Sequence, residues 1–169
     1  VSGVIATTLV DTRTLPSFRT IARARLLGAL SYALLPLLPP LLRGLRLPMR
    51  WVAPMHLITN DPDFSALFSR DPLGGGSLVT LGFFRSLRFF DVRVEPEEFT
   101  SCPVLVCHPT LDPWTPAYLS HEFYGRIAGE KEWVDLEGCG HLPYDEPGAA
   151  QLLEAVEGFL DRVACGQDK

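Results

Sequence analysis

Short apolar runs alternate with helix-like patterns in the last third of the chain. Residues 103–107 (PVLVC) and 132–136 (EWVDL) are typical of strands that are buried on at least one face. Between them, apolar residues recur at helical spacing over 119–127, after a predicted N-cap at Thr115. Apolar residues over 152–163 predict a final helix. This strand–helix–strand–helix order predicts a parallel sheet with right-handed crossovers.

The first part of the chain has a different pattern. Residues 3–9 (GVIATTL) are short, apolar and β-branched, which predicts one more buried parallel strand. Residues 16–99 instead carry helix-like patterns interrupted by prolines and by a loop at 73–77 (LGGGS). We therefore predict an α/β fold with a short parallel sheet and flanking helices. Its core would comprise residues 1–15 and 100–169, with 16–99 as an inserted helical cap.

The composition is typical of a globular chain, and its charges are unevenly distributed along the sequence. Of the 169 residues, 47% are hydrophobic and 21% charged, enough apolar material for a core. The net charge of −5 argues against nucleic acid as a main partner. Residues 1–50 nevertheless hold seven Arg and one acid. Two interpretations stay open: a leucine-rich basic front that contacts anionic lipid head groups, or a solvated cationic face.

Three further features bear on location. The uncharged stretch 26–42 is short for a membrane span and contains three prolines, so we expect apolar helices covering a pocket. The four cysteines form no C-x-x-C pair, which favours a reducing compartment and a cytoplasmic protein. The chain opens at Val1 without an initiator Met or a charged leader, so we expect a fragment or a processed chain.

Asp112 and His141 are the candidate catalytic residues. Each lies five residues after a predicted strand, and one βα unit separates them, so their loops should face one crevice at the same sheet edge. A carboxylate that accepts from one imidazole nitrogen fixes the tautomer and leaves the other nitrogen as a general base. Gly138 and Gly140 would let the backbone turn and present the ring.

Other roles for these residues stay open. His141 could be a turn histidine with a structural hydrogen bond, and Asp112 could form an Asx-turn before Pro113. Another Asp-Pro pair, at Asp61, predicts a turn and a helix start. His108, Asp112 and His141 together could also hold a zinc ion.

Two segments resemble the C-terminal part of the α/β-hydrolase superfamily: PVLVCHPTLDPWTP (103–116) and LEGCGHLPYDEPG (136–148). The family pattern after the acid's strand is close to H-G-x-x-D-x-x-x-P. His108, Asp112 and Pro116 match it, whereas Pro109 replaces the glycine. The resemblance implies that Asp112 is the triad acid and His141 the triad histidine. It also implies an esterase- or lipase-like serine hydrolase that needs no cofactor or metal and acts on a small-molecule ester or other acyl substrate.

The family's nucleophile elbow, G-x-S-x-G, is absent from this sequence. Ser77 follows two glycines but has Val79 at the final glycine position, and Cys107 and Cys139 are poor candidates because of their places in a strand and beside the histidine. We therefore expect the nucleophile, and the N-terminal half of the fold, upstream of Val1, and no hydrolysis of nitrophenyl esters by the isolated chain.

The missing nucleophile leaves the chemistry open. A serine would hydrolyse esters, thioesters or amides, and an aspartate would hydrolyse epoxides or haloalkanes. A non-catalytic binding domain with the same fold is the remaining alternative. The leucine-rich region 26–47 favours an apolar acyl substrate over a polar one, unless these leucines are only the core of the cap.

Overall fold

The computed structural model describes residues 1–165, which form two compact units. The first, here called the sheet unit, comprises Val1–Val10 and the chain from Val92 onwards. The second, here called the insert unit, comprises Asp11–Asp91. Each unit is described by itself.

A parallel sheet forms the centre of the sheet unit. Its strands, in the order β1-β4-β5, are β1 (Val4–Ala6), β4 (Val104–Pro109) and β5 (Lys131–Leu136). Val106 pairs with Ala6 on one side and with Trp133 on the other. Every residue of β4 is buried, as expected for the central strand of a parallel sheet. The parallel sheet predicted from the sequence is confirmed, although β1 is shorter than the run 3–9.

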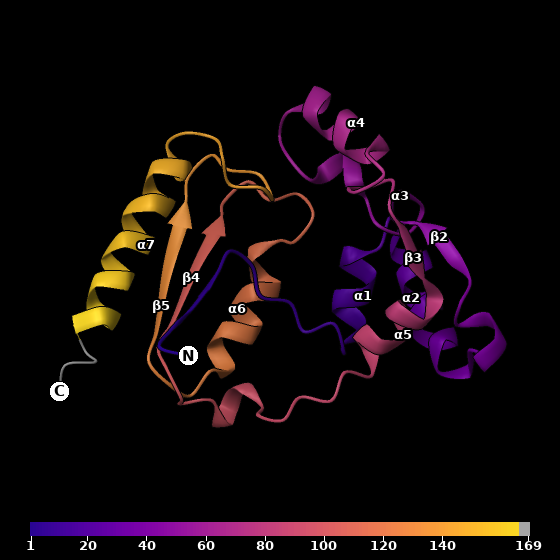
Figure 1. Cartoon of the computed structure of the whole chain (residues 1–169), viewed down its shortest axis with the longest axis horizontal. Helices are drawn as coiled ribbons and strands as arrows, with labels where there is room; N and C mark the ends of the chain where they lie inside the picture. Colours follow the sequence, from indigo (N-terminus) through magenta and orange to yellow (C-terminus); the bar gives the residue numbers. More distant parts are fainter. Residues whose placement is uncertain (166–169) are drawn as a thin grey trace. The chain divides into compact units, whose positions relative to one another are not determined.

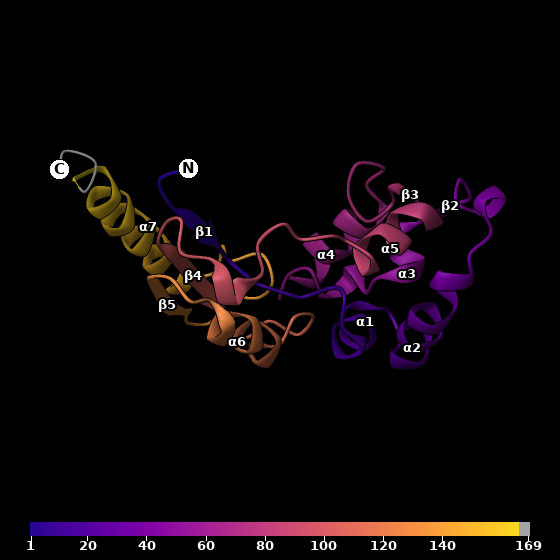
Figure 2. The same ribbon diagram turned by 90° about the horizontal axis from the view of Figure 1, so that it is seen from below.

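Two helices cover opposite faces of this sheet, as Figure 2 shows. Helix α7 (Gly148–Cys165) packs on the face with Leu105 and Leu136, and its Phe159 belongs to their core cluster. Helix α6 (Ala117–Arg126) packs on the other face, where Val104 and Val106 lie. Side chains of successive strand residues point to opposite faces, so one strand supplies both cores. A short 3-10 turn, Pro96–Glu98, precedes β4.

The insert unit consists of short elements (Figure 1). Its helices are α1 (Leu15–Ile21), α2 (Arg25–Leu34), α3 (Met49–Val52), α4 (Pro62–Arg70) and α5 (Leu81–Arg88), with 3-10 turns at Leu35–Leu37, Pro40–Leu42 and Met55–Leu57. Strands β2 (Arg46–Pro48) and β3 (Leu78–Thr80) pair antiparallel. The prediction of a helical segment over 16–99 therefore missed a small sheet. Strands of three residues are too short to show an alternating pattern in the sequence.

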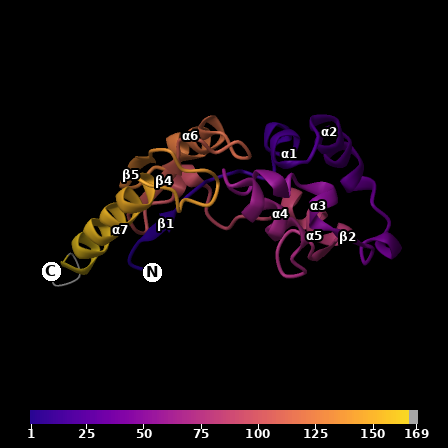
Figure 3. The same cartoon turned by 90° about the horizontal axis from the view of Figure 1, so that it is seen from above.

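Helices α1 and α2 lie side by side, as seen in Figure 3. Their close approach depends on Gly28, because a Cβ there would lie 2.1 Å from the carbonyl oxygen of Phe18. The rings of Phe18 and Tyr32 meet edge to face, with centroids 5.6 Å apart. The buried face of α2 is therefore the one that carries Gly28.

Candidate active site

The loops that follow β4 and β5 are joined by backbone hydrogen bonds. The amide of Thr110 donates to the Leu136 carbonyl at 3.0 Å, and the amide of Leu111 donates to the Cys139 carbonyl at 3.0 Å. The Thr110 hydroxyl accepts from the Gly138 amide at 3.1 Å. Both loops leave the tips of the strand arrows at the same end of the sheet in Figure 1. These contacts place the loop that carries Asp112 beside the loop that carries His141.

The structure brings Asp112 and His141 together. The distance from Asp112 Oδ2 to His141 Nδ1 is 2.8 Å. The Asp112 side chain is 1% exposed and that of His141 is 19% exposed. With the carboxylate ionised, Nδ1 is the donor, so Nε2 is the nitrogen that can accept a proton from another group.

Asp112 uses its two carboxylate oxygens differently. Oδ1 accepts from the amides of Trp114 and Thr115, both at 2.8 Å, which is an Asx-turn. Oδ2 accepts from His141 and from the Thr115 hydroxyl. The structural and the catalytic interpretation of Asp112 are therefore compatible, because the turn holds one oxygen and presents the other to the imidazole.

Thr115 is the site residue that sequence reasoning missed. We predicted it as the N-cap of the following helix, but α6 has its N-cap at Pro116 and no side-chain cap. The Thr115 hydroxyl instead donates to Asp112 and lies 3.0 Å from His141 Nδ1. The signal for this role is the Asp-x-x-Thr spacing, since an Asx-turn brings residue i+3 back to the aspartate.

These contacts keep Asp112 ionised. Burial alone would raise the pKa of the Asp112 carboxyl, because desolvation disfavours the charged form. The hydrogen bonds from His141 and from the hydroxyl and amide of Thr115 outweigh burial and lower this pKa below its usual value of 3.8. The site therefore holds a carboxylate that can stabilise a protonated imidazole.

The loop before His141 turns sharply. Gly138 has a φ of 75°, in the region that favours glycine. The Cys139 thiol donates to the Asp145 carbonyl at 3.1 Å, and the Gly140 amide donates to the Asp145 carboxylate at 3.5 Å. The Trp114 ring lies 4.6 Å from the His141 ring, centroid to centroid. The imidazole is thus held by the Asx-turn loop on one side and by its own turn on the other.

His108 does not join this pair. Its side chain lies on the α6 face of β4, where its ring stacks on Trp133 with centroids 5.4 Å apart. Nδ1 donates to the Pro109 carbonyl at 2.9 Å, and the buried Nε2 has no hydrogen-bond partner within the described residues. Burial lowers the pKa of His108, which favours its neutral form. The zinc alternative needed His108 beside Asp112 and His141, and among residues 1–165 no cluster of three metal-ligating side chains occurs.

The two cysteine candidates for the nucleophile are unsuited to the role. Burial, aided by the charge of Glu132, raises the pKa of the Cys107 thiol to about 11. Burial also raises the pKa of Cys139. Both thiols are therefore protonated at neutral pH and poorly nucleophilic. Ser77 lies in the insert unit, between the turn at 72–76 and β3.

A cavity of about 500 Å³ lies at the other end of the sheet. It is lined by residues at or just before the starts of strands, such as Ser2, Val104 and Lys131, and by Phe159 and Arg162 of α7. The cations at its wall already have partners, since Arg162 pairs with Glu132 and Lys131 donates to carbonyls at the end of α6. This cavity is formed by residues other than Asp112 and His141.

Several solved structures resemble the chain, among them these three. A monoacylglycerol lipase from Paleococcus ferrophilus aligns with 96% of this chain and 60% of its own length, with a TM-score of 0.62 and 20% identity. The hypothetical protein PA2218 from Pseudomonas aeruginosa aligns with 96% of this chain and 53% of its own, with a TM-score of 0.56 and 16% identity. For a putative non-heme bromoperoxidase from Mycobacterium tuberculosis the TM-score is 0.48, at 21% identity, and 96% of this chain aligns with 59% of that one.

The chain thus spans 53–60% of the length of these solved structures. No family profile and no curated protein sequence matches it. In the part of the chain that the structure describes, no helix has both the length and the apolar character needed to cross a bilayer.

Proposed function

Because the chain has part of the fold of the α/β-hydrolase superfamily, we propose that it supplies two members of the catalytic triad of an acyl hydrolase, with Asp112 as the triad carboxylate and His141 as the general base. The observation that carries the proposal is the 2.8 Å contact between a buried carboxylate and a partly exposed imidazole. A solvated histidine on a turn needs no buried carboxylate partner. An imidazole that must become protonated during a reaction does.

The proposed reaction moves one proton through His141 Nε2. A nucleophile hydroxyl gives its proton to Nε2 as its oxygen attacks the acyl carbonyl, and Asp112 stabilises the imidazolium that forms. The imidazolium then protonates the leaving group. Water repeats the sequence and releases the acid. The substrate class that we propose is an ester or other acyl compound, in keeping with the lipase named above.

The nucleophile of this proposal lies outside these 169 residues. The sequence holds no G-x-S-x-G elbow, and the chain covers 60% of the lipase structure. We propose that a further polypeptide segment, the N-terminal half of the fold, supplies a serine and the oxyanion donors. The alternative with an aspartate nucleophile, acting on epoxides or haloalkanes, uses the same acid and base.

The test is active-site labelling of the complete gene product that contains this chain. A fluorophosphonate probe should label one activated serine. The His141→Ala and Asp112→Asn variants should lose about 10⁴-fold in ester turnover, the order of loss seen when a triad member is changed. His121→Ala is the matched control, since His121 is an exposed histidine stacked on Trp133 in the same unit.

Each other outcome has a meaning. Uptake of ¹⁸O from labelled water into an aspartate during a single turnover, without probe labelling, would establish the aspartate chemistry. A complete gene product with neither labelling nor turnover would refute the hydrolase proposal. The absence of an elbow from this sequence favours a non-catalytic binding domain in that case.

A further inference from the structure

We propose that the insert unit binds the surface of an anionic lipid bilayer through the exposed leucines of residues 26–45, here called the leucine segment. This proposal is independent of the acid–base pair. It rests on exposure, on charge and on the length of the helix that carries most of the segment.

The outer face of α2 is apolar. Leu26, Leu30 and Leu34 recur every four residues, so they share one face of the helix, and they are 71%, 49% and 58% exposed. The face with Gly28 packs against α1 instead. The leucines continue after the helix, with Leu41 at 91% exposure. Soluble proteins rarely expose an apolar stripe of this kind without a partner for it.

The charge around the segment identifies the partner. Between Asp11 and Asp61 the sequence contains no acidic residue. Arg25, Arg43 and Arg46 flank the leucines and are exposed. Apolar side chains beside arginines, without acids, complement a surface that is apolar inside and negative outside, as an anionic bilayer is. Arginine can also extend its charged end towards a head group while its stem stays among apolar groups.

The geometry predicts binding on the membrane surface. Helix α2 has ten residues, about 15 Å, which is half the thickness of the hydrocarbon layer. The helix would lie in the interface, with its leucines towards the acyl chains. Such binding depends on both apolar area and charge. Substitutions of the leucines and of the arginines can therefore test the two contributions separately.

The experiment is sedimentation of the purified chain with vesicles of phosphatidylserine and phosphatidylcholine, and with vesicles of phosphatidylcholine alone. We expect binding to the anionic vesicles that weakens as salt is added. Each Arg→Gln change at Arg25, Arg43 or Arg46 should weaken binding about fivefold. The triple variant Leu26→Ser, Leu30→Ser, Leu34→Ser should weaken it at least tenfold, about the value of one buried leucine.

The matched control is Leu153→Ser with Leu160→Ser. These α7 leucines are 58% and 53% exposed, like those of α2, but lie in the acidic sheet unit. The control should bind as the unchanged chain does, and circular dichroism should show the same helix content in all variants. If the leucine triple does not fold, the Arg→Gln series and the salt dependence still decide the question.

Three results would overturn the proposal. The first is no binding to anionic vesicles. The second is equal binding to both kinds of vesicle without any effect of salt or of the Arg→Gln changes. The third is that the unchanged chain forms a dimer that does not bind vesicles, whereas the Leu→Ser triple variant is a monomer. The leucine segment would then join two copies of the chain.

Discussion

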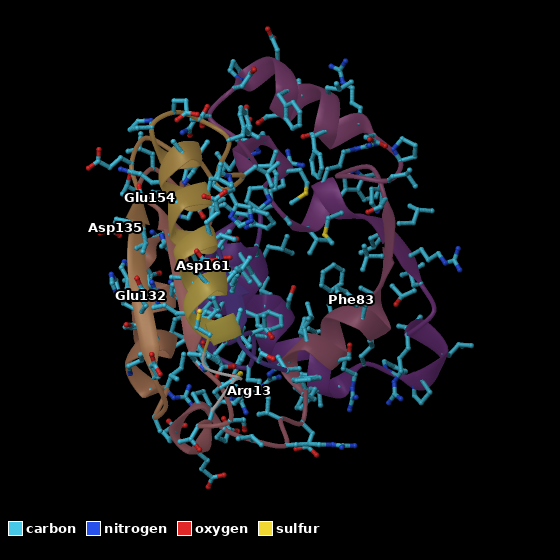
Figure 4. The ribbon with its side chains drawn as sticks, turned by 60° about the vertical axis from the view of Figure 1, so that its left-hand side comes forward. Arg13, Phe83, Glu132, Asp135, Glu154 and Asp161 are labelled. Carbon is cyan, nitrogen blue, oxygen red and sulfur yellow. The ribbon has the colours of Figure 1, made fainter. Side chains whose placement is uncertain are left out.

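The two units differ in net charge and in how many of their large hydrophobic side chains are exposed. The sheet unit holds five basic and fifteen acidic residues, a balance of −10, whereas the insert unit holds ten Arg and five Asp, a balance of +5. Figure 4 labels some of these acids: Glu132 and Asp135 on β5, and Glu154 and Asp161 on α7. Among residues 1–165, seventeen large hydrophobic residues are exposed in the insert unit and eight in the sheet unit. The sheet unit is therefore organised around its own core, and the insert unit presents much of its apolar surface outwards.

A pair of leucine substitutions, one in each unit, tests this difference and includes the largest expected loss of stability. Leu105→Ala, at a fully buried position of β4, should lower the free energy of unfolding by about 3 kcal/mol, because it leaves a cavity between the sheet and α7. Leu26→Ala, on the exposed face of α2, should change it by less than about 0.5 kcal/mol. Urea unfolding followed by circular dichroism measures both. Similar losses in the two variants would contradict the contrast between the units.

The same contrast explains how far the sequence predicts the fold. The strands and helices after residue 100 were predicted because each buried run is long enough to show its periodicity, and β4 and β5 are paired as expected. The pair β2–β3 was missed, because each strand has three residues and the two strands pair across the intervening residues 49–77. The ends of this segment also meet, since the Met49 amide donates to the Ser77 carbonyl. A local pattern identifies an element only when the element is long enough to repeat its period several times.

At the candidate site, the sequence predicts the residues but not how they are used. Asp61 and Asp112 each precede a proline, and each accepts from the amides two and three residues later. Asp61 caps α4 in the insert unit. Asp112 makes the same turn and adds His141 through its second oxygen. The local sequence is alike in both, and only the strand pairing that brings the β5 loop beside Asp112 makes the difference.

This pair of aspartates allows a second test. Asp112→Asn should lower the free energy of unfolding at pH 7 by about 2 kcal/mol, because it removes a charge-assisted hydrogen bond at a buried group. Asp61→Asn should cost only a few tenths of a kcal/mol, since Asn caps helices as well as Asp does. Urea unfolding at pH 7 measures both changes. Equal effects would mean that the contact with His141 adds nothing to the turn.

The stability lost in Asp112→Asn should depend on pH in a defined direction. The pKa of Asp112 is lower in the folded chain than its usual value of 3.8, so its stabilisation is present above about pH 4 and is lost as the pH falls through the lower, folded value. The difference in the free energy of unfolding between the unchanged chain and Asp112→Asn should therefore shrink as the pH falls below about 4. A difference that grows as the pH falls would contradict the lowered pKa.

At the candidate site, the smallest expected loss of stability is that of a substitution at Thr115. The Thr115 hydroxyl makes a contact that distinguishes this site from a simple Asx-turn. Thr115→Val keeps the shape of the side chain and removes the hydroxyl that donates to Asp112. The pKa of Asp112 should rise, since its ionised form loses a donor, and the free energy of unfolding should fall by about 1 kcal/mol. Carbon-13 NMR of the Asp112 carboxyl carbon measures the pKa.

The control variant Thr115→Ser retains the hydroxyl. It should restore the pKa of Asp112 even if it does not restore all of the stability lost with the methyl group. If Val and Ser lower the stability equally and leave the pKa of Asp112 unchanged, Thr115 only fills space. If the pKa follows the hydroxyl, Thr115 is a positioning residue that acts through the carboxylate on His141.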